Sequence, residues 1–343
     1  MLLLCQYLLL YLLLLQKSEI KIIVFNIFGL KVEVKILESD RDQNFYLSNN
    51  NAEEFVLKIY NPSESIDIIN MHTNALDHIQ KYSSDFIEAP KIINTIHGAK
   101  VGRIKNNYIE YILRLVTYIN GIQFKDIDKE SISYSQLGSF IGRLDGVLES
   151  FSDPSAKRIF PWDIKNIDFL RKHSKIFNDK KKETIISYYI KEYEKNILPK
   201  QHLLRNSIIH NDCNDHNIIV NNDNKIKGII DFGDMVYTYV AGEPAVCIAY
   251  AVLGKDEPFS IAGKILKGFC KTYPLLEDEI NSIIYLVCIR LSISVTMAKY
   301  RSEIFPENKY LTVSNIKAWE FLYYMYEENL EDWSDRLVQY VRV

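Results

Sequence analysis

The first part of the chain after residue 20 consists mainly of short segments in which apolar and polar residues alternate. A period of two predicts half-buried β-strands, whereas apolar residues three and four positions apart predict a helix. The expected elements are a helix at 20–29, strands at Val32–Leu37, Asn44–Leu47 and Glu54–Tyr60, a helix that ends near Lys81, and strands near 91–96 and 108–116. Ser63 or Ser65 is expected to cap the second helix.

Beyond Gly121 the apolar spacing changes, and helices are expected to dominate. Helical spacing covers 137–151, 166–177, 183–197, 241–252, 258–272, 276–300 and 312–329. Three short extended segments interrupt these helices, at Ile208–Ile209, Asn217–Val220 and Lys225–Ile230. A mostly β part joined to a mostly helical part predicts two lobes with a cleft between them, and ligand sites favour such interfaces.

Composition and charge are those of an ordinary globular protein. Of the 343 residues 48% are hydrophobic and 25% are charged, and 41 Lys and Arg against 44 Asp and Glu give a net charge of −3. This charge does not favour nucleic acid as a partner. The five cysteines are scattered and form no C-x-x-C pair, so a disulfide framework or a zinc site is not favoured. A reducing compartment, and hence a cytoplasmic location, is expected.

The first fifteen residues, MLLLCQYLLLYLLLL, are unusually apolar. The run is shorter than the roughly 20 residues that span a bilayer, and it lacks the basic start and the cleavage site of a secretory signal. We assign residues 1–19 to an N-terminal extension without a role in the chemistry. An extra helix packed on the domain and a weak membrane anchor through residues 1–15 are the alternatives.

Residues 208–234, IIHNDCNDHNIIVNNDNKIKGIIDFGD, contain two motifs known from protein kinases. The first is H-x-D-x-x-x-x-N, filled by His210, Asp212 and Asn217, and the second is D-F-G, which begins at Asp231. In protein kinases the Asp of the first motif accepts the proton of the substrate hydroxyl, and the Asn and the D-F-G Asp hold Mg²⁺. Apolar strands flank both motifs, so these side chains are expected to converge on one magnesium-dependent site.

Two other interpretations of this block are weaker. A single D-F-G is often only a turn, but two motifs in the kinase order, each beside a strand, argue against chance. A transition metal bound by His210, Asp212 and His216 is disfavoured because the pairing with Asp231 suits a hard ion such as Mg²⁺. We expect His210 to brace the catalytic loop by hydrogen bonding, and His216 to be solvated.

Lys58 lies in the apolar strand EFVLKIY, where a buried ammonium group without a partner would be costly. Taken together with the two kinase motifs downstream, this position predicts that Lys58 binds the α- and β-phosphates of a nucleotide, as the β3 Lys of kinases does. The alternative is a Lys on an edge strand that faces water.

The chain resembles the aminoglycoside/choline/homoserine phosphotransferase family, and within it the hydroxylysine-kinase-like branch. The matching segments are FGLKVEVKILESDRDQNFYL (28–47), VLKI (56–59), LRLVTYINGI (113–122), LGSFIGRLDGVL (137–148), PWDIKN (161–166), the catalytic block, EPAVCIAYAVLG (243–254) and RLSISVTMAKYR (290–301). SDRDQNF and PWDI are distinctive for that branch, whereas the catalytic block identifies only the superfamily.

This resemblance implies an α+β, two-lobed protein-kinase-like fold. The N-lobe, 20–119, would be an antiparallel sheet with one main helix, and the C-lobe, 120–343, would be larger and mostly helical. The resemblance also implies phosphate transfer from ATP or GTP, with Mg²⁺, to a hydroxyl of a small amine-containing molecule. The linker that would hold the nucleotide base is Val116, Thr117, Tyr118 and Ile119.

Two positions in the nucleotide and catalytic loops depart from the kinase pattern. The phosphate-covering loop has no glycine, so its contacts are expected from Ser39, Arg41, Gln43 and Asn44. Asn211 stands where relatives have Gly after the catalytic His, and Asn tolerates left-handed backbone better than most residues.

A third departure concerns the partner of Lys58. The helix position at which relatives of the superfamily carry a Glu is His72, and Glu64 and Asp67 come too early in the helix. The ion pair is therefore replaced, or Lys58 is held by phosphate alone.

The acceptor is expected to bind in the helical half, beside Asp212. Acidic residues there would attract an ammonium group, and an Arg would bind the carboxylate of an amino acid. The candidates are Asp163, Asp234, Glu243 and Arg290. Asp163 and Glu243 could instead be charges at helix ends, and Arg290 could be part of a buried ion pair.

The best candidate acceptor is 5-hydroxylysine, with homoserine, choline, ethanolamine and aminoglycosides as alternatives. A nucleotide-binding pseudokinase is the alternative from another class. The missing glycines and the missing Glu partner favour a pseudokinase, whereas the intact Asp212, Asn217 and Asp231 argue against it.

Overall fold

The computed structural model describes residues 15–39, 41–83, 85–106, 108–127, 133–304 and 315–342. The chain forms two compact units, Met1–Asn120 and Gly121–Val343. Residues 1–14 of the apolar extension, for which a membrane anchor was considered, lie outside the described residues, as does Asp40 of the phosphate loop.

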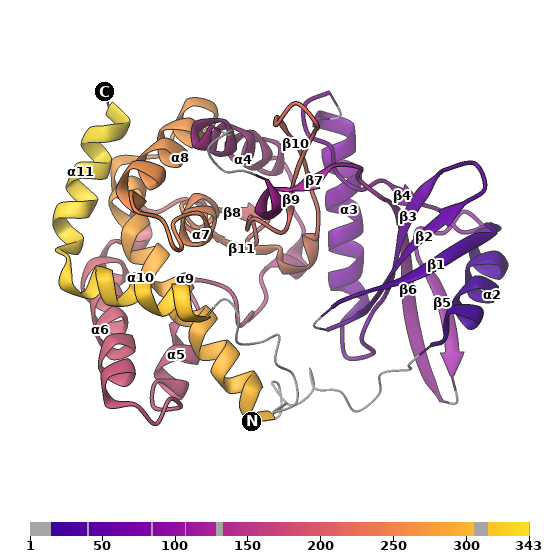
Figure 1. The fold of residues 1–343 in the computed structure, drawn as a ribbon, viewed down its shortest axis with the longest axis horizontal. Coiled ribbons are helices and arrows are strands. Elements are labelled where there is room, and N and C mark those ends of the chain that lie inside the picture. Colours follow the sequence, from indigo (N-terminus) through magenta and orange to yellow (C-terminus); the bar gives the residue numbers. More distant parts are fainter. Residues whose placement is uncertain are drawn as a thin grey trace. The chain divides into compact units, whose positions relative to one another are not determined.

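The described part of the N-terminal unit contains one antiparallel sheet (Figure 1). Its strands are β1 (Val32–Leu37), β2 (Gln43–Asn49), β3 (Glu54–Ile59), β4 (Ile92–Ile93), β5 (Gly102–Asn106) and β6 (Ile109–Thr117). Their order is β1-β2-β3-β6-β4, and β5 pairs with β6. The helices are α2 (Lys17–Phe28) and α3 (Ile66–Ser83), and the Ser65 hydroxyl accepts the Asp67 N–H as an N-cap. The predicted antiparallel N-lobe is confirmed, and β5 is an additional strand.

The alternation of residues along β3 determines which side of the sheet carries Lys58. Phe55, Leu57 and Ile59 are buried in a core that also contains the apolar face of α2. Successive strand residues point to opposite faces, so Lys58 lies on the other face. In the register of β3 with β6, Arg114 stands opposite Lys58. Its side chain donates a hydrogen bond to the Thr73 hydroxyl of α3 (3.5 Å). The sheet therefore separates an apolar side, covered by α2, from a polar side that carries Lys58.

The C-terminal unit is mostly helical, as predicted (Figure 1). Its helices are α4 (Tyr134–Leu148), α5 (Ile167–His173), α6 (Lys180–Asn196), α7 (Gly242–Ala251), α8 (Pro258–Thr272), α9 (Glu277–Ile304), α10 (Asn315–Glu327) and α11 (Leu330–Arg342). Two small antiparallel sheets lie among them: β10 (Ile226–Ile229), β9 (Ile218–Val220) and β7 (Ile122–Gln123), and β11 (Val236–Tyr239) with β8 (Asn206–Ile209). The elements α11, β7 and β11 are additions to those expected from the apolar pattern.

Helix α9 forms the buried centre of the C-terminal unit, where it packs against α5, α6, α7, α10 and α11. It is the one described helix long and apolar enough to cross a membrane, but 89% of its most apolar window is buried inside the structure. A helix that is apolar on all sides is typical of a protein core. Helix α9 is therefore a core helix, and it carries Arg290 into the interior.

Helices α4 and α8 pack so closely that their backbones touch, and glycines permit this approach. A Cβ atom at Gly138 would overlap the carbonyl oxygen of Ile265, and one at Gly268 would overlap that of Ser135. Both oxygens belong to the main chain, so neither can rotate away as a side chain could. The spacing between α4 and α8 thus depends on these two glycines.

We expect Gly138→Ala to destabilise the protein by about 1–3 kcal/mol, the usual cost of overpacking, because the new methyl group must push α8 away. Gly146→Ala on the same helix is the matched control, since its Cβ would find its nearest neighbour, in Tyr273, at 3.6 Å. The denaturant midpoint of each variant measures the effect. Equal midpoints for Gly138→Ala and the control would contradict this packing argument.

Candidate active site

Residues 210–217 form the loop between β8 and β9, and Asp231 follows β10. Antiparallel pairing of β8 with β11 and of β9 with β10 anchors both motifs. The main chain also joins them, because the N–H of Ile230 donates to the carbonyl oxygen of Asn217 (2.9 Å). The structure thus brings the two motifs predicted from the sequence together.

His210 is fully buried and links the two motifs a second time. Its Nε2 donates to the carbonyl oxygen of Ile230 (3.1 Å), and its Nδ1 accepts the N–H of Asp212 (3.2 Å). These partners require the tautomer that carries its proton on Nε2. The imidazole therefore fixes the backbone of Asp212 relative to the residue before Asp231.

Asn211 has a left-handed backbone with φ +65°, which confirms the expectation for this position. Its N–H donates to Oε2 of Glu243 (2.8 Å), and its side-chain amide donates to the carbonyl oxygens of Asp234 (3.2 Å) and Trp162 (3.5 Å). Asn211 thus supplies the backbone conformation of a glycine together with contacts that a glycine lacks.

Three side chains hold the carboxylate of Asp212, which is 20% exposed. Oδ1 accepts from Nη2 of Arg290 (3.1 Å) and Nδ2 of Asn214 (2.9 Å), and Oδ2 accepts from Nδ2 of Asn217 (2.7 Å). Burial raises the pKa of Asp212 to about 8, the charges of Asp234 and Asp231 add to this increase, and Arg290 opposes it. A carboxyl group with a pKa near neutrality is suited to accept and release a proton.

Asn217 and Asp231 supply the oxygen atoms expected to hold a metal ion. The amide nitrogen of Asn217 donates to both the carbonyl oxygen and Oδ2 of Asp212, so its amide oxygen remains for another partner. Asp231 is exposed, has φ +60°, and accepts the N–H of Gly233 through Oδ1 (3.3 Å). A carboxylate and an amide oxygen are donors that suit a hard cation such as Mg²⁺.

Arg158 is a supporting residue that the motifs do not identify. Its Nη2 donates to the carbonyl oxygens of Gly233 and Met235 (2.9 Å each), and its guanidinium lies 4.1 Å from the centre of the Phe160 ring. It therefore holds the turn that follows Asp231. Its only sequence signal is a position just before the PWDI segment.

In the N-terminal unit, Lys58 forms an ion pair with Asp42 (3.0 Å), and the two side chains are 14% and 10% exposed. Oδ1 of Asp42 also accepts the N–H of Asn61 (3.0 Å), which fixes the carboxylate. In relatives of the superfamily a Glu of the helix pairs with this Lys, but here the corresponding position is occupied by the buried His72. Asp42 therefore takes the place of that Glu as the partner of Lys58. The edge-strand interpretation of Lys58 is wrong, because β3 lies between β2 and β6.

The residues expected to contact the nucleotide lie at the ends of strands in this unit. Ser39 is exposed, whereas Arg41, Gln43 and Asn44 are half-buried. At the end of β6, Val116 and Thr117 are half-buried, Tyr118 is exposed and Ile119 is buried.

Two amides of this linker already have partners. The N–H of Thr117 donates to the carbonyl oxygen of Lys91, and the N–H of Tyr118 donates to that of Glu54 (2.9 Å each). A base held at this linker would therefore have to use groups other than these two amides.

Comparison with known proteins agrees with this geometry. A family model described as the phosphotransferase enzyme family matches residues 33–277. The chain belongs to this family. Among curated proteins, hydroxylysine kinase of Mus musculus is 29% identical over 91% of this chain and 89% of its own length. Hydroxylysine kinase of Xenopus laevis is 29% identical over 90% of this chain and 89% of its length. The chain is thus a phosphotransferase that acts on an alcohol group.

Solved structures of low sequence identity share the fold of this phosphotransferase. An amicoumacin kinase superposes with a TM-score of 0.70 at 13% identity, covering 93% of this chain and 97% of its own. A microcompartment-associated aminopropanol kinase gives a TM-score of 0.65 at 11% identity, covering 95% and 94%. The kinase-like two-lobed fold expected from the sequence is confirmed.

The four acceptor candidates of the phosphotransferase differ in their surroundings. Asp234 is buried close enough to Asp212 for its charge to raise the pKa of that carboxyl, and Arg290 binds Asp212 directly. Asp163 is buried, with its carboxylate bound to the Thr238 hydroxyl (2.6 Å) and the Lys165 N–H (3.0 Å). Glu243 is fully buried and binds the Asn211 N–H. The carboxylates of Asp163 and Glu243 therefore bind the protein's own groups.

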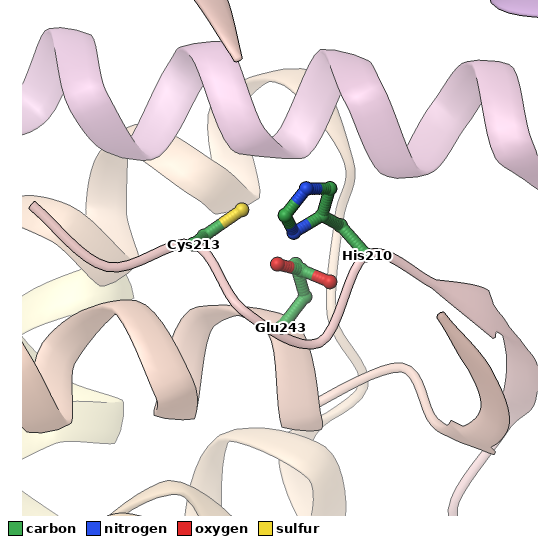
Figure 2. A group of neighbouring side chains, drawn as sticks. All are labelled: His210, Cys213 and Glu243. Atoms are coloured by element: carbon green, nitrogen blue, oxygen red, sulfur yellow. The ribbon is translucent and has the colours of Figure 1, made fainter. Parts of the chain in front are cut away.

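Two residues of the 210–217 loop, His210 and Cys213, form a buried cluster with Glu243 of α7 (Figure 2). Their potential metal-binding atoms lie within 4.8 Å of one another. Both ring nitrogens of His210 and Oε2 of Glu243 already bind the loop and its neighbours. Burial, with a further contribution from Glu243, raises the pKa of Cys213 well above its usual value, so the thiol stays protonated. The cluster therefore supports the loop.

The transition-metal set considered from the sequence is not assembled. His216 has a side chain that is 50% exposed, and its Nε2 lies 4.0 Å from Oδ1 of Asp215. Among the described residues, His210 groups with Cys213 and Glu243, not with His216.

Proposed function

We propose that this phosphotransferase transfers the γ-phosphate of ATP or GTP to a hydroxyl of an amine-containing metabolite, with 5-hydroxylysine as the best candidate. The observation that carries the proposal is the set of bonds that holds Asp212. Its carboxylate is fixed by Arg290, Asn214 and Asn217, and its loop is joined to the residue before Asp231. The similarity to hydroxylysine kinases over most of the chain supports the choice of acceptor.

Asp212 is proposed to act as the base that accepts the proton of the acceptor hydroxyl. Its hydrogen bonds restrict the rotation of the carboxylate, so an approaching hydroxyl meets an acceptor in a fixed orientation. Its raised pKa makes it a stronger base than an exposed carboxylate, and proton transfer from the hydroxyl becomes easier. His210 contributes by keeping the loop backbone in place.

Asn217 and Asp231 are proposed to hold Mg²⁺, which neutralises charge on the phosphates when it is bound. The hydrogen bonds from the amide nitrogen of Asn217 to Asp212 keep the amide turned one way, so its oxygen can act as a ligand. Lys58 is proposed to bind the α- and β-phosphates, with Asp42 keeping the ammonium in place.

The nucleotide is proposed to be ATP or GTP. The amicoumacin kinase of similar fold was solved with AMP-PNP, an ATP analogue, and Ca²⁺. An aminoglycoside 2′-phosphotransferase with a TM-score of 0.59 at 12% identity was solved with GDP. Both nucleotides therefore belong in the test.

The proposed location is the cytoplasm, because the four cysteines among the described residues are free, as is usual in a reducing compartment.

Acceptors with a quaternary ammonium group are less suitable than hydroxylysine. Choline is usually recognised by a cage of aromatic rings. Trp162, the tryptophan nearest to Asp212 in the hydrogen-bond network, has the guanidinium groups of Arg290 and Arg301 beside its ring, at 4.8 Å and 5.9 Å. Trp319 and Trp333 are buried. Two cations therefore already lie beside the Trp162 ring, which makes it a poor candidate for part of a cage around a quaternary ammonium group.

The test is nucleotide consumption by the purified full chain, with ATP or GTP and Mg²⁺, across hydroxylysine, homoserine, choline, ethanolamine and kanamycin. We expect the highest kcat/KM with 5-hydroxylysine, and loss of turnover when Mg²⁺ is removed by a chelator. Nucleotide binding without turnover on any of these acceptors would favour the pseudokinase alternative. A higher kcat/KM with another acceptor would replace hydroxylysine and leave the reaction class intact.

A further inference from the structure

Two arginines of α9 lie on one face of this helix and meet at the same tryptophan. Arg290 and Arg301 are about three helical turns apart, so their side chains project in nearly the same direction. The guanidinium carbon of Arg290 lies 4.8 Å from the centre of the Trp162 ring, and that of Arg301 lies 5.9 Å from it. The distance between the two guanidinium carbons therefore cannot exceed the sum of these two distances.

Arg290 is the inner arginine, and each of its three guanidinium nitrogens donates a hydrogen bond. Nη2 donates to Asp212 (3.1 Å), Nη1 donates to the carbonyl oxygen of Trp162 (2.9 Å), and Nε donates to the hydroxyl of Tyr250 (3.2 Å). The residue is 1% exposed. A substrate carboxylate could reach it only by displacing one of these groups, and the displaced group would then be buried without its partner.

Arg301 is the outer arginine, and its side chain is half-buried. An acceptor whose hydroxyl meets Asp212 and whose carbon chain extends along Trp162 would bring its far end toward Arg301. A guanidinium group matches a carboxylate with two parallel hydrogen bonds, and the half-buried position strengthens such a pair relative to one in water.

We propose that Arg301 binds the carboxylate of an amino-acid acceptor, while Arg290 positions Asp212 and does not contact the acceptor. The inference rests on the proposed function, because it assumes that the acceptor hydroxyl lies at Asp212. It narrows the substrate class to hydroxylated amino acids, as opposed to amino alcohols that lack a carboxylate.

The test compares 5-hydroxy-L-lysine with 1,5-diaminopentan-2-ol, which has the same hydroxyl and both amines but no carboxylate. For Arg301→Gln we expect the KM for hydroxylysine to rise about tenfold to a hundredfold, the loss of one charge-assisted hydrogen-bonded pair, with kcat nearly unchanged. The KM for the diamine should stay the same. Arg301→Lys should recover part of the loss for hydroxylysine, because it keeps the charge but not the paired donors.

Lys299→Gln is the matched control, because Lys299 lies on the same stretch of α9 and pairs with Glu303 (3.2 Å). It should leave both acceptors unaffected. Wild-type protein that uses the diamine as well as hydroxylysine would overturn the inference while leaving the kinase proposal standing. An equal rise of KM for both acceptors in Arg301→Gln would also overturn it. No phosphorylation of any acceptor would instead remove the proposed function, and the inference with it.

Discussion

Asp212→Asn is expected to lower kcat by about two to four orders of magnitude while leaving nucleotide affinity nearly intact. The proposed base contacts the acceptor hydroxyl, and the nucleotide contacts are assigned to Lys58 and to the metal ligands. Asn keeps the shape of Asp but cannot accept the proton. It also brings an NH₂ group toward the donors of Arg290 or Asn217, so one of their present hydrogen bonds is lost.

Asp215→Asn is the control for this experiment, because it makes the same exchange in the same loop on a side chain that does not hold the Asp212 carboxylate. Single-turnover phosphorylation measures the chemical step, and displacement of a fluorescent nucleotide measures affinity. Asp212→Ala should show the same loss of rate, with a lower thermal stability, because Arg290 then loses the carboxylate to which it donates a hydrogen bond. A rate near that of the wild type in Asp212→Asn would show that Asp212 is not the base.

The secondary structure could be predicted where apolar residues keep a clear period. The helix predicted at 258–272 coincides with α8, and the strands at 32–37 and 54–60 agree with β1 and β3 to within one residue. Helix α11 is the main omission. It buries Leu330, Trp333, Leu337 and Val338 at helical spacing, but acidic and basic residues fill the positions between them and weaken the apolar pattern.

Strand β5 could not be predicted for a different reason. Its sequence, GRIKN, offers few apolar residues, and it becomes a strand because each of its residues pairs with β6. An ion pair between Arg103 and Glu110 joins the two strands. Such a strand is stabilised by its neighbour more than by its own sequence, so a local pattern does not reveal it.

In the candidate site, too, the sequence reveals residues that lie close together in the chain but not the partners that the fold brings to them. The motif residues could be found because a loop between two strands fixes their spacing. Asp42 as the partner of Lys58, and Arg290 as the partner of Asp212, depend on pairs far apart in the chain. The pairing of β2 with β3 places Asp42, the residue just before β2, beside Lys58, which is a consequence of register and not of composition.

The strongest effect outside the motifs is expected for Arg290→Met, which should lower kcat about a hundredfold and stability by about 3 kcal/mol. Removing one member of a buried ion pair leaves the other charge without compensation. Here the charge left is that of Asp212, which already has Asp234 and Asp231 nearby. Because Arg290 opposes the increase in the pKa of Asp212, its loss should raise that pKa further. The proposed base must be ionised, so the acidic limb of the kcat profile should move to higher pH.

Arg290→Lys separates the roles of charge and geometry at this position. An ammonium group keeps the positive charge beside Asp212, but it is a single compact centre. It cannot span Asp212, the Trp162 carbonyl oxygen and the Tyr250 hydroxyl as the guanidinium does. We therefore expect Arg290→Lys to restore the pH profile and stability more fully than kcat, with the KM for hydroxylysine little changed in either variant. A large increase in KM at unchanged kcat would mean that Arg290 binds the acceptor, and it would reverse the roles given to Arg290 and Arg301.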